Sequence, residues 1–385
     1  GNTLTSIGSK AFENAALLAD VYAEPTTAPA VQADSFSGAG TSVQGSKTFH
    51  VASVEAYSSW TTAASGYTME ALGPDYLSEG LYYRASGEDP WKSEIPQTFT
   101  TLYVKTAGDN TVMTAEQMKA VADAVKALAT PATVDFSEVV YESETFPNSF
   151  KSNANLAGIV FPQNVTKTAS AAFQKTGMTS VTLLKGISYG SNAFDSCASL
   201  VSVTVEEGVT EIGNYMFQNT KLTDVTLPNS VTKIGASAFN GCSLTTINFG
   251  QGVKTIENSA FQNCGELTEI ILPDATETLG QNAFGDCPKL AKISLGKNMK
   301  TLEAYCFVGY SKGCPLLGDI ICRATTPPTL KDDYGTGPFG GDWSPVAGKD
   351  VPAENRIIHL PKSADPVGGT GAYADSSWVK LTSST

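Results

Sequence analysis

A phenylalanine recurs at a nearly fixed interval through the second half of the chain. Successive members are 23, 21, 23, 22, 22, 23 and 23 residues apart, by subtraction over Phe150, Phe173, Phe194, Phe217, Phe239, Phe261, Phe284 and Phe307. A period of about 20 to 50 residues is typical of chains built from stacked units, because one unit alone cannot bury its apolar face. The interval therefore restricts this region to a solenoid of repeated turns.

A second pattern, L-x-x-I-x-L, lies between the phenylalanines and is seen in Leu222-x-x-Val225-x-Leu227. Its apolar residues alternate with polar ones, which predicts a short strand with one face toward the core and the other toward solvent. A return segment such as residues 231–239 then leads the chain back across the far side of the turn and ends in the phenylalanine. We expect each inward phenylalanine to contribute roughly 1.5 to 3 kcal/mol on burial.

The combined pattern L-x-x-I-x-L-P-x-x-V-x-x-I-G-x-x-A-F-x-x-C, fullest from Leu222 to Cys242, resembles the BspA-like class of bacterial leucine-rich repeats. The resemblance covers roughly residues 134–322 and rests on several positions that recur over some eight turns. It implies a leucine-rich-repeat solenoid, mainly β with short irregular or helical returns and right-handed stacked turns. Two departures, Thr168 and Thr276 at slots that are apolar elsewhere, are expected to weaken their turns.

A longer-range duplication predicts the domain organisation. The stretch from Arg323 to residue 341 resembles residues 24–38, and the two histidines, His50 and His359, take equivalent positions after them. We therefore predict a last repeat turn and C-terminal cap of a first array over 1–75, an intervening strand and helix segment over 76–133, the main array over 134–322, and its C-terminal cap over 323–385. The intervening small α+β segment is expected to cap the first turn of the main array, which solenoids need for solubility. An independent binding module is the alternative.

The intervening segment contains signals for two strands and one helix. Residues 77–85 and 99–106 have strand character. Thr114-x-x-Gln117 resembles a capping box that opens a helix. The apolar residues that follow, Met118, Val121, Val125 and Leu128, fall on one helical face.

The seven cysteines all occupy repeat slots. Cys197, Cys242, Cys264 and Cys287 stand three residues after a repeat phenylalanine, Cys314 does so if four residues are inserted before it, Cys306 precedes a phenylalanine, and Cys322 ends a strand. Side chains at equivalent slots of stacked turns point in parallel, whereas a disulfide needs them to point at each other. We expect buried thiols that pack as small apolar groups, with one or two disulfides as the alternative. The absence of any CxxC pair argues against zinc.

No constellation for catalysis is found, and we expect neither an enzyme nor a cofactor. A nucleophilic triad would have to recruit one of only two histidines, and both are explained by the duplicated caps. The formal net charge of -13 disfavours nucleic acid as a partner. No run of about 18 apolar residues is present, so we expect no membrane span.

The solvent side of the strands is the candidate binding surface. Its outward slots are polar apart from Ile271, and hydroxyl and amide groups there could hydrogen-bond a host protein or glycan. The alternatives are that threonine merely suits exposed strands, or that the chain is a structural spacer or assembly scaffold. A second candidate surface is formed by aromatic residues of the C-terminal cap. Their alternative role is to close the end of the core. They are Tyr334, Phe339, Trp343 and Trp378. The ligand-binding residues that we predict are Ser180, Thr182, Ser202, Thr204, Asp224, Thr226, Thr246, Asn248, Glu269, Lys292 and Ser294.

The chain begins within a repeat, since Leu4-Thr-Ser-Ile7-Gly-Ser-Lys-Ala11-Phe12 matches the return segment. We expect further repeats upstream of residue 2 in the native protein, with Gly1 a cloning remnant. The resemblance implies an extracellular or cell-surface location, with a signal peptide and a lipid-anchored cysteine in the upstream segment if the protein is anchored. The oligomeric state is left open by the sequence.

Overall fold

The predicted strands form parallel columns in the computed structural model. The structure describes residues 6–9, 11–15, 20–23, 28–32, 35–37, 39, 47–51, 57, 60, 67–71, 80–107, 111–308, 313–331 and 357–359. The chain divides into two compact units. The first comprises residues 1–117, 134–142 and 160–163, and the second comprises residues 118–133, 143–159 and 164–385.

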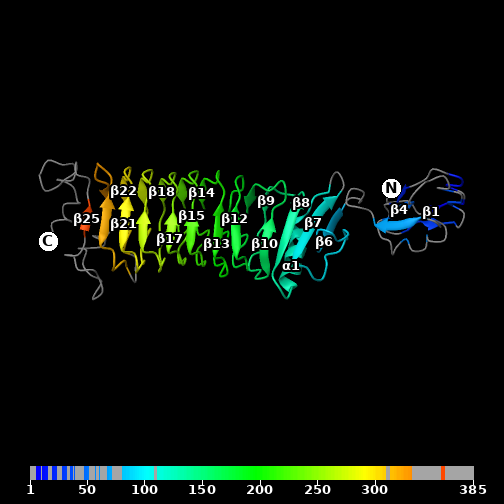
Figure 1. Cartoon of the computed structure of the whole chain (residues 1–385), viewed down its shortest axis with the longest axis horizontal. Coiled ribbons are helices and arrows are strands. Elements are labelled where there is room, and N and C mark those ends of the chain that lie inside the picture. Colours follow the sequence, from blue (N-terminus) through cyan, green and yellow to red (C-terminus); the bar gives the residue numbers. More distant parts are fainter. Residues whose placement is uncertain are drawn as a thin grey trace. The chain divides into compact units, whose positions relative to one another are not determined.

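In the second unit, the L-x-x-I-x-L segments form one column of short parallel strands. Equivalent residues pair across neighbouring turns, as Val225 does with Ile247 and Ile270 with Ile293. The sheets within the column are β12-β13, β15-β17 and β19-β21-β23-β25, and their strands lie side by side in Figure 1. These strands are β12 (Ser180–Leu183), β13 (Ser202–Val205), β15 (Asp224–Thr226), β17 (Thr246–Asn248), β19 (Glu269–Ile271), β21 (Lys292–Leu295), β23 (Asp319–Cys322) and β25 (Ile357–His359).

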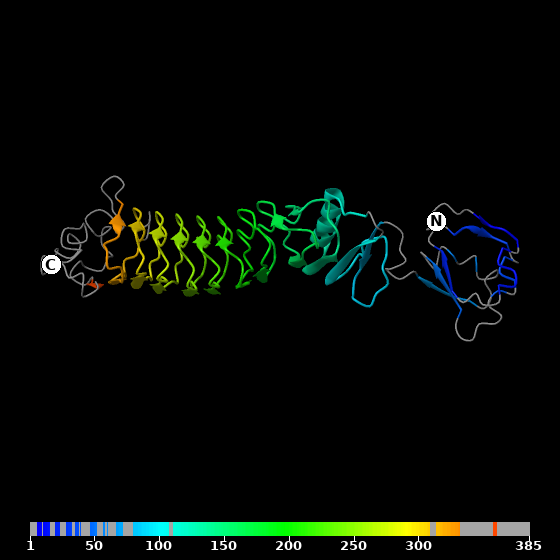
Figure 2. The same cartoon turned by 90° about the horizontal axis from the view of Figure 1, so that it is seen from above.

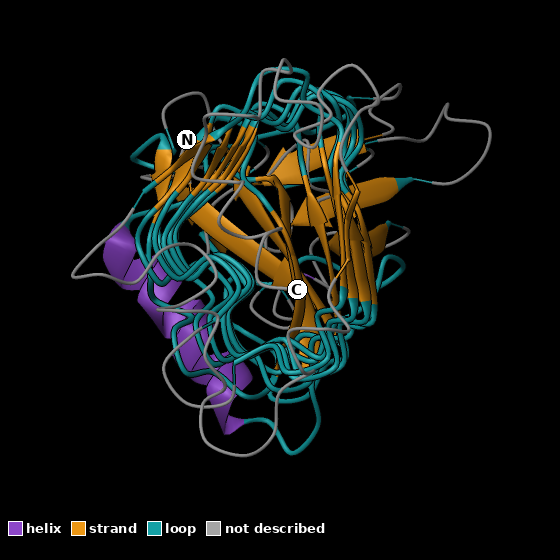
Figure 3. Cartoon of the chain, turned by 90° about the vertical axis from the view of Figure 1, so that its left-hand side faces the viewer, coloured by secondary structure: helices purple, strands orange, loops and turns teal. Residues whose placement is uncertain are grey.

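The return segments form a second column of two-residue strands. Six of them pair in parallel in the order β14-β16-β18-β20-β22-β24, and β11 pairs with β9 in the same way. Figure 2 shows the turns of the array side by side, and Figure 3, seen from one end, shows the strands of each column overlying one another. The leucine-rich-repeat solenoid predicted from the sequence is confirmed. The strands are β9 (Thr145–Phe146), β11 (Lys167–Thr168), β14 (Glu211–Ile212), β16 (Lys233–Ile234), β18 (Thr255–Ile256), β20 (Thr278–Leu279), β22 (Thr301–Leu302) and β24 (Thr329–Leu330).

The repeat phenylalanines form a stacked column inside the turns. From Phe173 to Phe307, neighbouring ring centroids lie 5.2 to 6.2 Å apart with planes inclined by 4 to 19°. Nearly parallel rings at these separations are offset rather than face to face, the arrangement that aromatic quadrupoles favour. Every ring in this run is at most 2% exposed, so the column forms the centre of the core.

Each return segment bends at two residues that flank the phenylalanine. Around Phe194, Asn192 has a φ of 61° and Ser196 a φ of 57°, and comparable positive values recur from turn to turn. The residues at these corners include Lys175 and Tyr215 as well as asparagine, so no residue type marks them in the sequence. Each corner directs the backbone N–H of the phenylalanine to the next turn, as from Phe194 to the Met216 carbonyl at 2.9 Å.

The cysteines occupy the predicted slots and are free thiols. All are buried except Cys314, which is half-buried. Five of them do more than fill apolar space, because their thiols donate hydrogen bonds to the phenylalanine carbonyl of the preceding turn. These five are Cys197, Cys242, Cys264, Cys287 and Cys314. The Sγ of Cys242 lies 3.1 Å from the Phe217 oxygen, and that of Cys264 lies 3.3 Å from the Phe239 oxygen. Burial raises the pKa of Cys242 to about 11 and that of Cys264 well above its ordinary value.

The two departures from the repeat pattern are accommodated by hydrogen bonds. Thr276 is fully buried, and its hydroxyl donates to the Val253 carbonyl at 2.9 Å. The Thr168 hydroxyl accepts a hydrogen bond from the Gly190 N–H at 3.0 Å. Because each buried hydroxyl has a partner, the penalty for placing it in an apolar slot is offset.

In the first unit, the N-terminal residues repeat the geometry of the array. The rings of Phe12 and Phe36 stack with centroids 5.0 Å apart, and Phe36 packs in a core with Phe49, Tyr57 and Trp60. The strands are β1 (Ser6–Ile7) with β3 (Ala30–Val31), and β2 (Asp20–Ala23), β4 (Thr48–Val51) and β5 (Thr68–Ala71) in the order β2-β4-β5.

The intervening segment has the elements predicted for it. Strands β6 (Gly80–Arg84), β7 (Thr101–Ala107), β8 (Ala132–Glu138) and β10 (Leu156–Val160) form a sheet in the order β10-β8-β7-β6, with β6 and β7 antiparallel. Helix α1 (Ala115–Ala127) opens with the predicted capping box. The Gln117 N–H donates to the Thr114 hydroxyl at 3.3 Å, and the Thr114 N–H donates to the Gln117 Oε1 at 2.8 Å.

The end of helix α1 is held by the first turn of the array. Within the second unit, the side-chain amide of Asn153 donates to the Ala122 carbonyl, and that of Asn155 donates to the Leu128 carbonyl, each at 2.8 Å. Asn155 also donates to the carbonyl of Lys126 at 3.1 Å, one of the last four carbonyl groups that a helix leaves open. The four-part domain division stays a prediction, and Tyr334, Phe339, Trp343 and Trp378 lie outside the described residues.

Candidate functional site

The outward side chains of the first strand column form two rows, which we call the strand face. One row runs through Ser180, Ser202, Asp224, Thr246, Glu269, Lys292 and Asp319, and the other through Thr182, Thr204, Thr226, Asn248, Ile271, Ser294 and Ile321. Nine of the eleven predicted ligand-binding residues are exposed, from Ser180 to Glu269 along the two rows. The alternation in sequence therefore predicted their orientation, whereas their binding role stays a prediction.

Two of the predicted residues differ from this pattern. Lys292 is half-buried, and Ser294 is only 8% exposed, so the prediction that Ser294 faces solvent is wrong. Ser294 lies between Ile271 and Ile321 of the neighbouring strands. A small side chain between two larger ones is screened from water even when it points away from the core.

The hydroxyl part of the strand face is open to a partner. Among the described residues, the side chains of Thr204, Thr226 and Thr246 form no hydrogen bond and are exposed. Their backbone is fixed by the paired strands and by the buried side chains Val225 and Leu227 beneath. A partner would therefore meet hydroxyl groups that lose little freedom on binding.

The charged part of the strand face is largely neutralised by pairing between turns. Lys292 Nζ lies 2.8 Å from Glu269 Oε1, and hydrogen bonding to Glu269 raises the pKa of Lys292. His359 continues the row of Ile321, and its Nε2 lies 3.5 Å from Asp319 Oδ1 on the neighbouring strand. Half-exposed pairs such as Lys292–Glu269 contribute little to stability, but they leave this part of the face without a concentrated charge.

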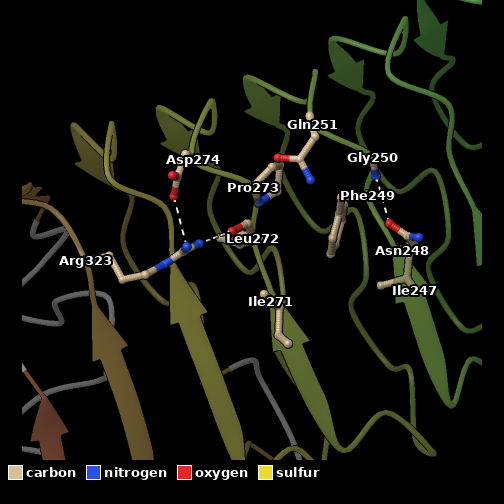
Figure 4. Close-up of a pocket in the computed structure, with 10 residues that line it drawn as sticks. All are labelled: Ile247, Asn248, Phe249, Gly250, Gln251, Ile271, Leu272, Pro273, Asp274 and Arg323. Carbon is tan, nitrogen blue, oxygen red and sulfur yellow. Dashed lines mark hydrogen bonds and ion pairs between the residues drawn. The ribbon is translucent and has the colours of Figure 1, made fainter.

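A pocket of about 350 Å³ opens beside β17 and β19 (Figure 4). It is lined by residues from the ends of these strands and the turns that follow, together with one residue after β23. The strand face contributes Asn248 and Ile271 to it, and Ile271 is 59% exposed. The other lining residues are Ile247, Phe249, Gly250, Gln251, Leu272, Pro273, Asp274 and Arg323.

Arg323 reaches the pocket from two turns away. Its Nη2 donates to the Leu272 carbonyl at 2.6 Å, its Nε donates to the Leu295 carbonyl at 3.1 Å, and its Nη1 lies 3.0 Å from Asp274 Oδ1. The equivalent slot in the turn between them is Gly296, which has no side chain to obstruct the crossing. A Cβ atom at Gly296 would collide with the Pro273 carbonyl, so only glycine fits there.

Asp274 is the acidic partner of this arginine. Its second oxygen, Oδ2, lies 2.9 Å from Lys297 Nζ. Hydrogen bonding to Lys297 and the charge of Arg323 hold the pKa of Asp274 below its ordinary value. The carboxylate therefore stays ionised and paired at neutral pH.

The family of the array follows from its sequence model. The model for the BspA type leucine rich repeat region matches residues 134–189 and 187–313 in six copies. Residues 134–313 belong to the BspA-type leucine-rich repeats. None of the curated proteins matches the chain in sequence.

Several solved structures are similar to this chain. A leucine rich cell surface protein from Faecalibacterium prausnitzii is 20% identical, with 83% of this chain and 77% of that one covered and a TM-score of 0.37. A leucine-rich repeat protein from Eubacterium ventriosum is 18% identical over 88% and 86% of the two chains, with a TM-score of 0.35. The pneumococcal vaccine antigen PcpA is 15% identical over 70% and 96%, with a TM-score of 0.24.

Sequence reasoning identified only part of the pocket in the BspA-type array. Asn248 was predicted as a ligand-binding residue, but Gln251, Asp274 and Arg323 were not. Arg323 lies 51 residues after Leu272 and was assigned to the C-terminal cap. The signal in the sequence was Gly296 followed, at the same repeat position of the next turn, by the long side chain of Arg323.

In the described part of the chain, no helix has the length and apolar character to cross a bilayer. The same residues contain no group of three or more histidine, cysteine, aspartate or glutamate side chains that could hold a metal ion.

Proposed function

We propose that this chain is a bacterial surface binding module that uses the strand face to attach to a host protein or glycan. The observation that supports this most directly is the set of hydroxyl groups on adjacent turns that form no hydrogen bond among the described residues: Thr204 and Thr226 in one row and Thr246 in the other. The BspA-type repeats support the surface location. A lipid anchor on a native segment upstream of residue 2 is part of the same proposal.

The fold favours binding because the surface is ordered before a partner arrives. The inward residues Val225 and Ile270 are at most 3% exposed and fix the strands that carry the outward side chains. Association then costs little ordering of the protein, which is the main benefit of a preorganised surface.

We propose that the chain has no catalytic activity. Burial raises the pKa of Cys242 and Cys264, so their thiols are poor nucleophiles at neutral pH. His359 is paired with Asp319 of the neighbouring strand, with 3.5 Å between Nε2 and Oδ1. An activity that depends on His359 would overturn this part of the proposal.

A binding screen against host matrix proteins and a glycan array tests the proposal. Saturable binding to at least one immobilised partner is expected, whereas a spacer or scaffold without a ligand would give none. The double substitution Thr226→Lys and Asn248→Lys is expected to abolish that binding, because a buried unpaired ammonium is costly in a complex. Both residues are exposed, so the free energy of unfolding should change by less than about 1 kcal/mol.

A matched control adds the same charge on the opposite column of strands. Thr210→Lys with Thr232→Lys places two lysines on adjacent turns at exposed positions of the return segments. Binding should survive in this control. Loss of binding in both variants would point to nonspecific charge repulsion, and retention in both would place the site away from the strand face.

A further inference from the structure

We infer that the pocket beside β17 and β19 binds one terminal unit of a neutral saccharide. The inference rests on the proposed function and adds to it the ligand class and the residues that recognise it. The pocket volume of about 350 Å³ lies at the lower end of the range of about 300 to 1,000 Å³ for small-molecule sites. It suits a sugar ring at the end of a chain whose remaining units lie along the strand face.

The charges in the pocket indicate a neutral ligand. Arg323 is bound to two carbonyl oxygens and to Asp274, and Asp274 is bound in turn to Lys297. Arg323 and Asp274 are the charged residues that line the pocket, and they compensate each other. A carboxylate, sulfate or phosphate ligand would have to displace Asp274 from Arg323, since charge-assisted recognition of an anion needs an available cation.

Two side-chain amides supply the hydrogen bonds. The Oδ1 atom of Asn248 accepts a hydrogen bond from the Gly250 N–H at 3.1 Å, which fixes the amide at the rim of the pocket (Figure 4). The Gln251 amide is exposed and unbonded among the described residues. Amides both donate and accept, as do the hydroxyl groups of a sugar.

The apolar lining complements the C–H face of a sugar ring. Ile271 is 59% exposed at the pocket, and Pro273, two residues further along the chain, also lines it. Burial of this exposed apolar surface is favourable. The pocket thus combines one exposed apolar side chain with a fixed amide at Asn248, an exposed amide at Gln251 and a lining pair of charges that cancel.

The test measures binding of three defined oligosaccharides to the full chain by saturation-transfer NMR and calorimetry. The probes are cellotriose, the trisaccharide of N-acetylglucosamine, and sialyllactose as an acidic probe. Binding of a neutral trisaccharide is expected, and comparison of the first two probes shows whether hydroxyl or acetamido groups dominate. Sialyllactose should bind at least about tenfold more weakly than the better neutral probe.

Near-isosteric variants assign the binding to the pocket. Asn248→Asp keeps the acceptor for the Gly250 N–H but replaces the amide donor by a carboxylate, and Gln251→Glu makes the same exchange at the second amide. Each should weaken binding about tenfold, the effect of losing one hydrogen bond that leaves its partner unsatisfied. Thr210→Asp, which adds the same charge at an exposed position of a return segment away from the strand face, should change the affinity less than twofold.

The results separate this inference from the function that it deepens. Failure of both neutral probes to bind, preferential binding of sialyllactose, or unchanged affinity in Asn248→Asp and Gln251→Glu would each overturn the saccharide pocket. Attachment to a matrix protein that is lost in the Thr226→Lys and Asn248→Lys double variant would still uphold the strand-face function. Absence of any binding in both experiments would overturn both.

Discussion

Lys175 is held in a left-handed backbone conformation that side chains with a Cβ atom rarely adopt. Its φ is 58°, and its side chain is exposed, so packing does not explain the choice of residue. Its N–H donates to the Asp195 carbonyl of the next turn at 2.9 Å. The corner is therefore imposed by stacking between turns rather than favoured by lysine, at a cost of about 1 to 2 kcal/mol.

Replacing Lys175 by glycine should stabilise the chain. Glycine adopts positive φ without strain but loses more conformational entropy on folding, so the expected net gain is about 0.5 to 1 kcal/mol. Urea denaturation measures it. Lys167→Gly is the control, because Lys167 is exposed in strand β11 and glycine there should destabilise. A lower free energy of unfolding in Lys175→Gly would show that the left-handed backbone conformation of Lys175 does not destabilise the native chain.

The buried thiols should respond to alkali but not to reductant. All seven cysteines are free, so a reducing agent at pH 7 should leave the melting temperature unchanged. Burial raises the folded-state pKa of Cys242 from 9.0 to about 11, so its stabilising contribution is present below pH 9 and is lost as the pH rises toward 11. Calorimetry from pH 7 to 11 should show this decline.

A variant separates the Cys242 thiol from other alkaline effects. Cys242→Thr places in this slot the residue found at Thr220 in the preceding turn. The decline above pH 9 should be smaller in this variant than in the native chain. A large drop in melting temperature on reduction at pH 7 would instead reveal a disulfide.

The sequence predicted side-chain direction better than exposure. Period-two alternation correctly placed Thr226 and Asn248 on the outside, because each lies between inward apolar residues of its strand. It failed for Ser294, whose exposure depends on the size of its neighbours Ile271 and Ile321. Those neighbours are one turn away in sequence, beyond the reach of a local pattern.

At the scale of elements, the phenylalanine column connects one turn to the next. Phe239 lies between Phe217 and Phe261, with ring centroids 5.5 and 5.2 Å away. Its side chain is fully buried, so its removal loses apolar contacts that no hydrogen bond replaces. Phe239→Ala should therefore cost about 3 to 5 kcal/mol in the free energy of unfolding, through lost burial and the cavity left in the stack.

Phe239→Leu is the matched control, because it keeps most of the apolar volume and should cost clearly less than the alanine variant. Urea denaturation followed by circular dichroism compares the two. A loss below about 1 kcal/mol for Phe239→Ala would mean that the column is not the core of the array.

The elements were more predictable than the pocket. The strand pattern, the return segments and the capping box at Thr114 are each local in sequence, and the structure contains all three. The pocket depends on Arg323 crossing over Gly296 to reach Asp274, an arrangement that exists only after three turns have stacked. Strand periodicity cannot indicate it, because none of these residues belongs to the alternating pattern.

At the scale of the whole molecule, the repeats place similar side chains at intervals of 22 or 23 residues along the chain and on adjacent strands in space. A single turn offers two outward groups, whereas the column offers two continuous rows. Binding by such a surface needs several turns at once. The proposed function is therefore a property of the stacked array rather than of any one residue.

Hydrogen–deuterium exchange, measured with and without the first partner found in the binding screen, tests the central claim most directly. If the strand face is the binding surface, exchange should slow in peptides that cover β12 to β19 and the turns after β17 and β19. Peptides that cover residues 80–107 should be unaffected. Slowed exchange confined to residues 80–107, with no change anywhere in the array, would contradict the assignment of binding to the strand face.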